Sequence, residues 1–261
     1  MDATQMTDGA QLARLAWECE HFGFPVARLE GRGRADSALW CGLAAARREG
    51  LHLVVLTTET GRELPAELLT EFCGGLMDRK ATFARSLLTV PADEPACENL
   101  AEEITEYHES TVSPYLLDLA ISSGVYSRFR VDPCFPHVVF ADMYRTWIER
   151  SVRHEIADVV LVASDSGCPG GLSGFVTIGR DHGVAKIGLI AVADQARGRG
   201  VGRRLMTAAH RWMRDHGAES AQVVTQLANA PACGLYRRCR YRLSALEHYY
   251  HMWPLTRAGE R

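Results

Sequence analysis

The stretch that most constrains the fold of this chain runs from Ile187 to Gly217, where an apolar strand, a glycine-rich turn and an amphipathic helix follow one another. The strand is predicted over Ile187–Val192, and apolar side chains then recur at helical spacing until Gly217 ends the helix. Glycines let the main chain approach a ligand closely, and the first N–H groups of a helix have no partner inside it. Because the helix dipole is also positive at this end, the stretch predicts a phosphate-binding turn.

The glycine spacing excludes two common kinds of phosphate site. The turn reads RGRGVG over residues 197–202, without the Gly-Lys-Ser/Thr ending of a Walker loop. A dinucleotide-binding fingerprint needs G-x-G-x-x-G after the first strand of its fold, whereas this turn has G-x-G-x-G late in the chain. The turn therefore predicts a phosphate ligand of another class.

Composition sets the broad class of protein. The chain has 261 residues, 47% of them hydrophobic and 23% charged, which suits one large or two small globular domains. A net charge of -3 gives no reason to expect a nucleic-acid or membrane partner. The eight cysteines form no C-x-x-C pair and are expected to be reduced thiols, and no signal peptide or membrane-spanning run is visible. We therefore expect a cytoplasmic protein, for which a homodimer is a possible assembly.

The chain is predicted to divide into residues 1–92 and residues 93–261. The boundary is the proline-flanked acidic segment PADEP at residues 91–95, and residues 1–10 are expected to be a tail. An aromatic-rich opening leads into a short strand in the first part. The β-α-β-α-β succession is then completed by a helix over 38–48, a strand over 51–57, a helix over 64–72 and a strand over 77–87.

The second part is predicted to place helices first, then an antiparallel meander, and then the strand, turn and helix of the opening stretch. The predicted elements are a strand beginning near 101–107, helices over 114–122 and 143–154 around a loop at 126–133, strands over 158–163, 172–178 and 187–192, a strand over 221–227, a short helix after Asn229, and a closing strand over 241–252.

Two motifs in this part resemble the GNAT superfamily of N-acyltransferases. The first is Val192-x-x-x-x-Arg197-Gly198-x-Gly200-x-Gly202-x-x-Leu205, which is similar to the turn that holds the pyrophosphate of acetyl-CoA in that family. The second is Asn229-x-x-Ala232-x-x-Leu235-Tyr236, although the Gly-Phe pair that usually follows is Arg240-Tyr241 here. The resemblance implies a GNAT fold, a mixed and mostly antiparallel twisted sheet flanked by helices, preceded by a smaller, incomplete GNAT-like α/β unit.

Further segments resemble one group within the superfamily, the TDP-fucosamine acetyltransferases. They are Trp17–Gly23, Leu76–Lys80, and Ser127-Arg128-Phe129 through Trp147-Ile148, so that the resemblance covers nearly all of the chain after about residue 12. That group acetylates the 4-amine of a dTDP-4-amino-4,6-dideoxyhexose. The resemblance thus implies acetyl-CoA as the co-substrate, a small-molecule amine as the acceptor, and no metal.

The resemblance also assigns roles to individual residues. Tyr236 is expected to be the general acid for the leaving thiolate, and Asp78 the candidate general base, acting through water. Arg128 and Arg130 are candidate anchors for the phosphates of a sugar nucleotide. The main chain near Val192 is expected to bind the pantetheine amides and to polarise the thioester carbonyl. The cofactor-binding set is Ile190, Ala191, Val192, Arg197, Gly198, Arg199, Gly200, Val201, Gly202, Arg203 and Asn229.

Each of these assignments has a structural alternative. Tyr236 can be a core tyrosine, Asp78 a solvated turn residue, and Asn229 only a helix cap. The two loop arginines can be solvated or ion-paired at the surface. The acceptor can also be a different amine, such as an amino acid, an antibiotic or a protein N-terminus. A non-catalytic acyl-CoA-binding module is the third hypothesis.

Overall fold

The structure is a computed structural model that describes residues 11–89 and 104–256, and these residues form two compact units. Of the described residues, the first unit takes 11–80, 131–139 and 246–256, and the second takes 81–89, 104–130 and 140–245. The predicted tail at 1–10 and the predicted boundary at 91–95 lie outside the described residues. The division at 92/93 therefore stays a proposal, while the units of the structure divide at residues 80/81 and 245/246.

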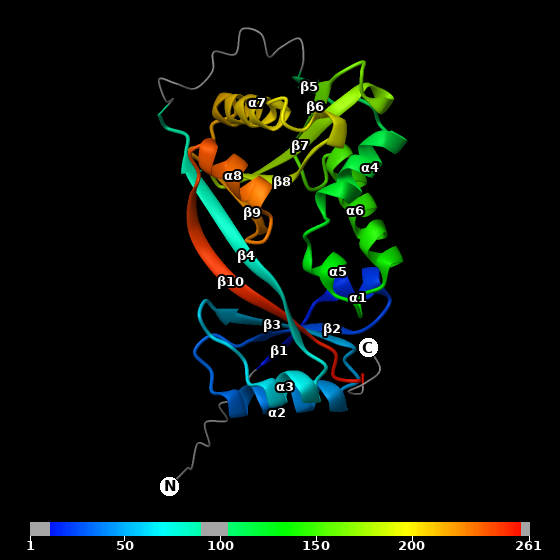
Figure 1. Cartoon of the computed structure of the whole chain (residues 1–261), viewed down its shortest axis with the longest axis vertical. Helices are drawn as coiled ribbons and strands as arrows, with labels where there is room; N and C mark the ends of the chain where they lie inside the picture. Colours follow the sequence, from blue (N-terminus) through cyan, green and yellow to red (C-terminus); the bar gives the residue numbers. More distant parts are fainter. Residues whose placement is uncertain (1–10, 90–103, 257–261) are drawn as a thin grey trace. The chain divides into compact units, whose positions relative to one another are not determined.

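The first unit is a small α/β layer (Figure 1). Its elements are β1 (Leu12–Arg14), α1 (Ala16–Phe22), β2 (Val26–Glu30), α2 (Asp36–Arg48), β3 (Leu53–Glu59), α3 (Ala66–Glu71), the first half of β4 (Gly75–Ser86) and the second half of β10 (Arg242–Met252). Strands β2 and β3 are parallel, and β10 runs antiparallel to β3. The core side chains Leu39 and Leu43 of α2, Leu68 of α3 and Leu56 of β3 are buried together, as expected for helices that cover one sheet face.

A buried polar network holds the chain end within the first unit. The carboxylate of Asp132 lies 2.6 Å from Nδ1 of His251 and accepts a hydrogen bond of 3.0 Å from Nε1 of Trp253. Burial alone would raise the pKa of Asp132, but hydrogen bonds from His251, the Cys134 N–H and Trp253 together lower it. The carboxylate is therefore ionised at neutral pH, because its donors compensate the loss of hydration.

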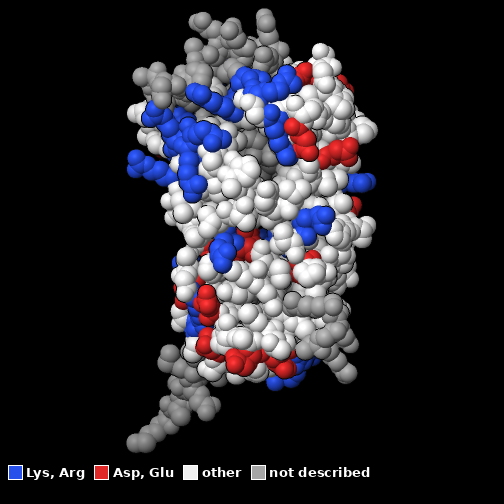
Figure 2. Space-filling view, in the orientation of Figure 1, with Lys and Arg blue, Asp and Glu red and all other residues white. Residues whose placement is uncertain are grey.

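The second unit has the predicted order of helices, meander, turn and helix. Its elements are the second half of β4, β5 (Ile104–Glu106), α4 (Pro114–Ser123), most of α5 (Arg128–Val131) and of α6 (His137–Val152), β6 (Val159–Ser164), η2 (Pro169–Gly171), β7 (Leu172–Asp181), β8 (Val184–Val192), η3 (Asp194–Ala196), α7 (Val201–Asp215), β9 (Ser220–Gln226), α8 (Ala230–Arg238) and the first half of β10. Strands β5 to β8 are antiparallel neighbours, and β9 is parallel to β8. Helices α7 and α4 flank these strands in Figure 1, and basic side chains gather over α7 and α8 in Figure 2.

One succession of elements occurs twice along the chain, and its two final strands, β4 and β10, exchange neighbours in the strand order. The succession is strand, helix, parallel strand, helix, strand: β2-α2-β3-α3-β4 in one case and β8-α7-β9-α8-β10 in the other. The order of the ten strands is β1-β2-β3-β10-β4-β9-β8-β7-β6-β5. Strand β10 therefore lies next to β3, and β4 lies next to β9. The mixed sheet flanked by helices that was predicted from the sequence is thus confirmed.

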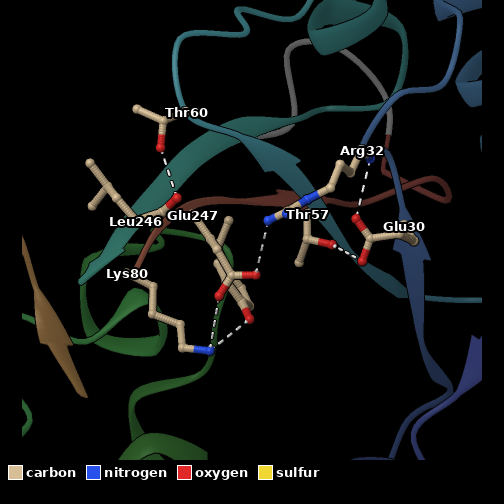
Figure 3. Close-up of polar contacts among 8 residues, drawn as sticks. Glu30, Arg32, Thr57, Thr60, Lys80, Leu246 and Glu247 are labelled. Carbon is tan, nitrogen blue, oxygen red and sulfur yellow. Dashed lines mark hydrogen bonds and ion pairs between the residues drawn. The ribbon is translucent and has the colours of Figure 1, made fainter. Parts of the chain in front are cut away.

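Polar contacts of β10 secure this exchanged strand in the first unit (Figure 3). Nζ of Lys80 donates to the Glu247 carboxylate at 3.3 Å and to the Tyr249 hydroxyl at 3.2 Å. Thr60 donates its hydroxyl to the carbonyl of Leu246 at 2.7 Å. These contacts supplement the β3–β10 ladder with side-chain bonds from β4 and from the chain after β3.

Most of the predicted elements are present, with ends displaced by a few residues. The aromatic-rich opening contains helix α1, which the sequence did not predict because seven residues with several aromatic side chains form a weak helical pattern. In α1 the Trp17 and His21 rings, four residues apart, stack with centroids 4.7 Å apart. The predicted loop at 126–133 contains the short helix α5. No helix in the described part of the chain is both long and apolar enough to span a membrane.

Candidate functional site

A cavity of about 600 Å³ in the second unit brings the predicted phosphate turn and Tyr236 together. It is bounded by the end of β8, the glycine-rich turn, the first turn of α7, helix α8 and the end of α4. The lining residues are Ser122, Ser123, Val125, Tyr126, Ile190, Ala191, Val192, Ala196, Arg197, Gly198, Gly200, Val201, Gly202, Arg203, Asn229, Pro231, Ala232, Leu235, Tyr236 and Arg238.

Strand β8 exposes its main chain to this cavity because β9 leaves it. The parallel ladder between β8 and β9 runs from Val184–Ser220 to Ile187–Val223, although β8 continues to Val192. On the other side, β7 stays paired with β8 to Val192, and the Ala193 N–H bonds to the Ser173 carbonyl at 2.9 Å. Since hydrogen bonding alternates along an antiparallel pair, the N–H and C=O groups of Ile190 and Val192 point away from β7, into the opening.

A bulge marks the point where β8 begins to diverge. Two residues of β8, Gly188 and Leu189, stand opposite the single residue Thr177 of β7. The Thr177 hydroxyl accepts a hydrogen bond of 2.8 Å from the Leu189 N–H, so this main-chain donor is satisfied inside the bulge. A Cβ atom at Gly188 would lie 2.8 Å from the same hydroxyl oxygen, and the site thus needs a residue without a side chain.

Two glycines of the turn lie where a side chain would be strained or tightly packed. Gly200 caps helix α7 with a φ of 80°, a left-handed conformation that glycine adopts without strain. Gly202 lies in the first turn of α7, where a Cβ atom would stand 3.3 Å from a methyl group of Leu235 and 3.6 Å from one of Val192. The first N–H groups of α7 therefore open to the cavity, while β8 and α8 approach the helix closely.

The cavity is electropositive. Arg197, Arg203 and Arg238 line it, and no acidic residue is among the described residues of the lining. The first turn of α7 also carries no acidic side chain, so the positive end of the helix dipole is not neutralised from within the helix. Arg197 forms an exposed ion pair of 2.7 Å with Asp194, which is not among the lining residues. The charge and the free N–H groups fit a phosphate.

Helix α8 places Tyr236 against the cavity. Its N-cap is Asn229, whose side chain accepts a hydrogen bond of 3.2 Å from the Ala232 N–H, with Pro231 in the first turn, as predicted. Tyr236 is 2% exposed, and its ring packs 5.8 Å from that of Phe83. Burial, together with the nearby Cys233 and Cys239 thiols, raises the pKa of Tyr236 well above that of a free phenol. The hydroxyl is therefore protonated throughout the physiological range.

The turn after α8 forms without the glycine that the family pattern has there. Arg240 takes a φ of 65°, so an arginine occupies the left-handed position at the end of the helix. Such a conformation is unfavourable for a residue with a Cβ atom, by about 1–2 kcal/mol. The surrounding structure therefore holds the chain in this turn.

Several predicted site residues lie elsewhere. Every residue of the predicted cofactor-binding set lines the cavity except Arg199, which pairs with Asp165 at 3.1 Å. Arg128, which stacks its guanidinium 4.3 Å above the Phe129 ring, and the exposed Arg130 are not among the lining residues. Asp78 is buried at 5% exposure in the part of β4 that belongs to the first unit.

Sequence reasoning did not find the residues at the end of α4 or Arg238. Ser122 and Ser123 donate their hydroxyls to the carbonyls of Leu119 and Ala120, at 2.8 and 2.6 Å, so their oxygen lone pairs remain available as acceptors. The half-exposed Val125 and Tyr126 follow them. No pattern in the sequence places these residues beside the turn near 200. Arg238, three residues after Leu235 of the motif, could have been found from helical spacing.

The corresponding stretch of the first unit is closed. The β2–β3 ladder runs to the last residue of β2, and the Gly31 N–H then bonds to the Thr57 carbonyl at 2.8 Å. The Gly31 carbonyl accepts from Arg62 at 2.6 Å, and Arg62 also pairs with Asp36 in the first turn of α2 at 2.6 Å. The main chain is thus paired where β8 is open, and a carboxylate already stabilises the helix N-terminus.

An electropositive cavity at an opened parallel strand pair, with main-chain donors and a glycine-capped helix, suits a co-substrate that carries phosphate groups. Residues 129–241 match the family model described as the acetyltransferase (GNAT) family. Residues 129–241 are therefore a domain of the GNAT acetyltransferase family, whose members use an acyl-CoA co-substrate and an amine. Among curated proteins, no sequence matches the chain.

Solved structures with the same fold share little sequence with this chain. A functionally unknown conserved protein from Staphylococcus epidermidis ATCC 12228 aligns with a TM-score of 0.62 and 12% identity, over 97% of this chain and 94% of its own. A tandem GNAT protein from the clavulanic acid biosynthesis pathway has a TM-score of 0.54 and 13% identity, over 89% and 76%. A GCN5-related N-acetyltransferase from Sphaerobacter thermophilus has a TM-score of 0.52 and 14% identity, over 89% and 74%.

Replacement of Gly200 by valine is expected to weaken acetyl-CoA binding. A branched side chain opposes the left-handed conformation by about 1–2 kcal/mol and would tilt the N–H groups of the turn. The dissociation constant measured by calorimetry should rise about tenfold or more. Gly183→Val is the matched control, since Gly183 has a φ of 79° in the turn after β7 and does not line the cavity. Equal affinities in both variants and the wild type would contradict this role of the turn.

The closed turn of the first unit predicts that each chain binds a single acetyl-CoA. The paired main chain around Gly31 and the carboxylate of Asp36 leave no counterpart of the open β8 edge there. Isothermal titration of the whole chain should give a stoichiometry of one, and Gly200→Val should reduce the affinity of that one site. Two equivalent binding events per chain would show that the first unit also takes acetyl-CoA.

Proposed function

We propose that the protein transfers an acetyl group from acetyl-CoA directly to the primary amine of a small molecule, with a dTDP-4-amino-4,6-dideoxyhexose as the first acceptor to test. The observation that carries the proposal is the cavity in which the open edge of β8, the glycine-capped α7 and the Tyr236 side chain meet. Direct transfer needs both reactants in one space, where orientation removes much of the entropic barrier.

The main chain and the arginines of the cavity hold acetyl-CoA in this proposal. The N–H groups of residues 198–203, with Arg197 and Arg203, bind the pyrophosphate. The main-chain groups of Ile190 and Val192 pair with the pantetheine amides, as a further strand would. The Val192 N–H polarises the thioester carbonyl, a contribution of the oxyanion-hole kind. Asn229 keeps its capping role and contacts the co-substrate at the cavity rim.

Tyr236 is proposed as the proton donor. As the amine nitrogen bonds to the acetyl carbon, the carbon–sulfur bond breaks and the thiolate receives a proton from the Tyr236 hydroxyl. The nitrogen gives up one proton to the general base, and a proton returned through solvent restores the Tyr236 hydroxyl, so the number of protons is conserved over the cycle. Because burial raises the pKa of Tyr236, the donor is present at every pH at which the protein is assayed.

The general base is proposed to be Asp78, acting through water. The described residues that line the cavity include no carboxylate and no imidazole, so the base does not come from the lining. Asp78 is a buried carboxylate of β4 and matches the base position in the group that the sequence resembles. Asp78→Asn should then lower turnover near neutral pH, and the turnover of this variant should recover above the pKa of the amine. A loss of turnover that does not change with pH would contradict this role.

The choice of a sugar nucleotide rests on the sequence resemblance. Arg128 and Arg130 remain the proposed anchors for its phosphates, and their positions outside the cavity lining are compatible with contacts to a long acceptor. The serine hydroxyls at the end of α4 can accept hydrogen bonds from an amine. These features do not discriminate against an amino acid, an antibiotic or a protein N-terminus, which are the second class of acceptor.

A thiol-release assay with acetyl-CoA and a panel of amines tests the proposal. Release with the dTDP-amino sugar, together with mass-spectrometric detection of its N-acetyl product, supports the proposed acceptor. Release with amino acids or antibiotics alone moves the assignment to the second class. Binding of acetyl-CoA without release for any amine would favour a non-catalytic module.

Tyr236→Phe should lower kcat by roughly 10²-fold, because a positioned general acid contributes about this much. The acetyl-CoA dissociation constant should stay nearly unchanged, since the ring and its packing are retained. Tyr250→Phe is the matched control: Tyr250 is also buried with a raised pKa, but it lies in the first unit. Wild-type turnover in Tyr236→Phe would remove this residue from the mechanism.

A further inference from the structure

A buried chain of hydrogen bonds connects β4, α7 and the end of α8 in the second unit. Nη1 of Arg85 lies 3.1 Å from Nδ1 of His210 and donates to the Cys239 carbonyl at 3.0 Å. Nε2 of His210 lies 3.0 Å from the Tyr241 hydroxyl. All three side chains are buried, with exposures of 8% for Arg85, 1% for His210 and 2% for Tyr241. None of the three lines the cavity.

The donors and acceptors of this chain follow from the chemistry of arginine. A guanidinium has only donors, so Nδ1 of His210 must be the acceptor and carries no proton. The imidazole is then neutral with its proton on Nε2, which donates to the Tyr241 oxygen. The network therefore has one direction, from Arg85 through His210 to Tyr241.

The network reaches Tyr236 through the main chain. The Tyr241 N–H bonds to the Tyr236 carbonyl at 3.0 Å, and the Arg240 N–H bonds to the Arg237 carbonyl at 3.0 Å. This pair of bonds is the Schellman pattern of a helix end, and it forms around the left-handed Arg240. Tyr241 is thus held on one side by His210 and on the other by Tyr236 itself.

We propose that Arg85, His210 and Tyr241 are positioning residues that set the Tyr236 hydroxyl relative to the phosphate turn. This inference rests on the function proposed above. Helix α7 begins at the phosphate turn and carries His210, and helix α8 carries Tyr236 and ends at the carbonyl bound by Arg85. Arg85 therefore fastens both helices to β4 at one point. Because the pantetheine arm has a fixed length, its sulfur reaches the Tyr236 hydroxyl only if the distance between the phosphate turn and this hydroxyl is kept.

The geometry explains why polar residues occupy a position that could be apolar. The rings of Tyr236 and Tyr241 pack 6.0 Å apart, and those of His210 and Tyr241 5.6 Å apart, so apolar side chains could fill the same space. Hydrogen bonds add direction, because they tolerate little change in length or angle. A displacement of about 1 Å at a reacting group costs up to about 10²-fold in rate.

The first test is the protonation of His210 in the whole chain. Long-range proton–nitrogen spectra of protein labelled with ¹⁵N-histidine, assigned by loss of the signals in His210→Asn, should show a neutral ring with its proton on Nε2. A proton on Nδ1, or a doubly protonated ring at neutral pH, would overturn the network. This readout needs no acceptor amine.

The second test separates positioning from folding. His210→Asn keeps an acceptor for Arg85 but loses the bond to Tyr241, and His210→Gln keeps a donor for Tyr241 but loses Arg85. Each should lower kcat by about 10-fold or more, with an unchanged dissociation constant for acetyl-CoA. In a Tyr236→Phe background neither should lower kcat further, because the group that they position is gone.

Met213→Ala is the control, since Met213 is fully buried in the same helix but outside the network and the cavity. It should lower the melting temperature without lowering kcat at a temperature where the protein is folded. An equal loss of kcat in this variant, or losses that multiply in the Tyr236→Phe background, would overturn the positioning role alone. Wild-type turnover in Tyr236→Phe would instead overturn the proposed acid, on which the positioning role rests.

Discussion

The site depends on the way strand β8 separates from β9 on one side while it stays paired with β7 on the other. Pairing with β7 continues to Val192, but pairing with β9 ends at Ile187. The bulge at Gly188 and Leu189 increases the local twist. The Thr177 hydroxyl accepts the hydrogen bond of the Leu189 N–H, which the bulge would otherwise leave unpaired. The main-chain groups beyond this point are left for a ligand, because unpaired polar groups are costly unless something pairs with them.

The two units show how one succession of elements gives opposite results. In both, a strand leads through a glycine-containing turn into a helix, and the next strand is parallel to the first. In the first unit the strand is paired to its end, and Asp36 occupies the first helical turn. In the second unit the strand opens and the helix begins without an acidic residue. A difference in pairing at a few residues therefore separates a structural turn from a binding turn.

The position of Tyr236 depends on one distant contact and on two contacts at the ends of its own helix. Phe83 packs on its ring, Tyr241 holds its carbonyl, and the cap at Asn229 sets the start of its helix. A helix as short as α8 would not be stable alone, so these contacts decide where the hydroxyl lies. The strained Arg240 persists for the same reason, because the packing around the helix end outweighs the cost of its backbone conformation.

Periodicity and local motifs in the sequence were enough for the order of the elements, the phosphate turn, the cap at Asn229 and the place of Tyr236 in its helix, because these features depend on neighbouring residues. The exchange of β4 and β10, the end of α4 at the cavity, and the pairing of Arg199 with Asp165 came only from the tertiary structure. Each joins residues far apart in the chain. Patterns of hydrophobicity predict that a strand is buried but not which strand lies beside it. The neighbour of each strand is determined only when the whole sheet assembles.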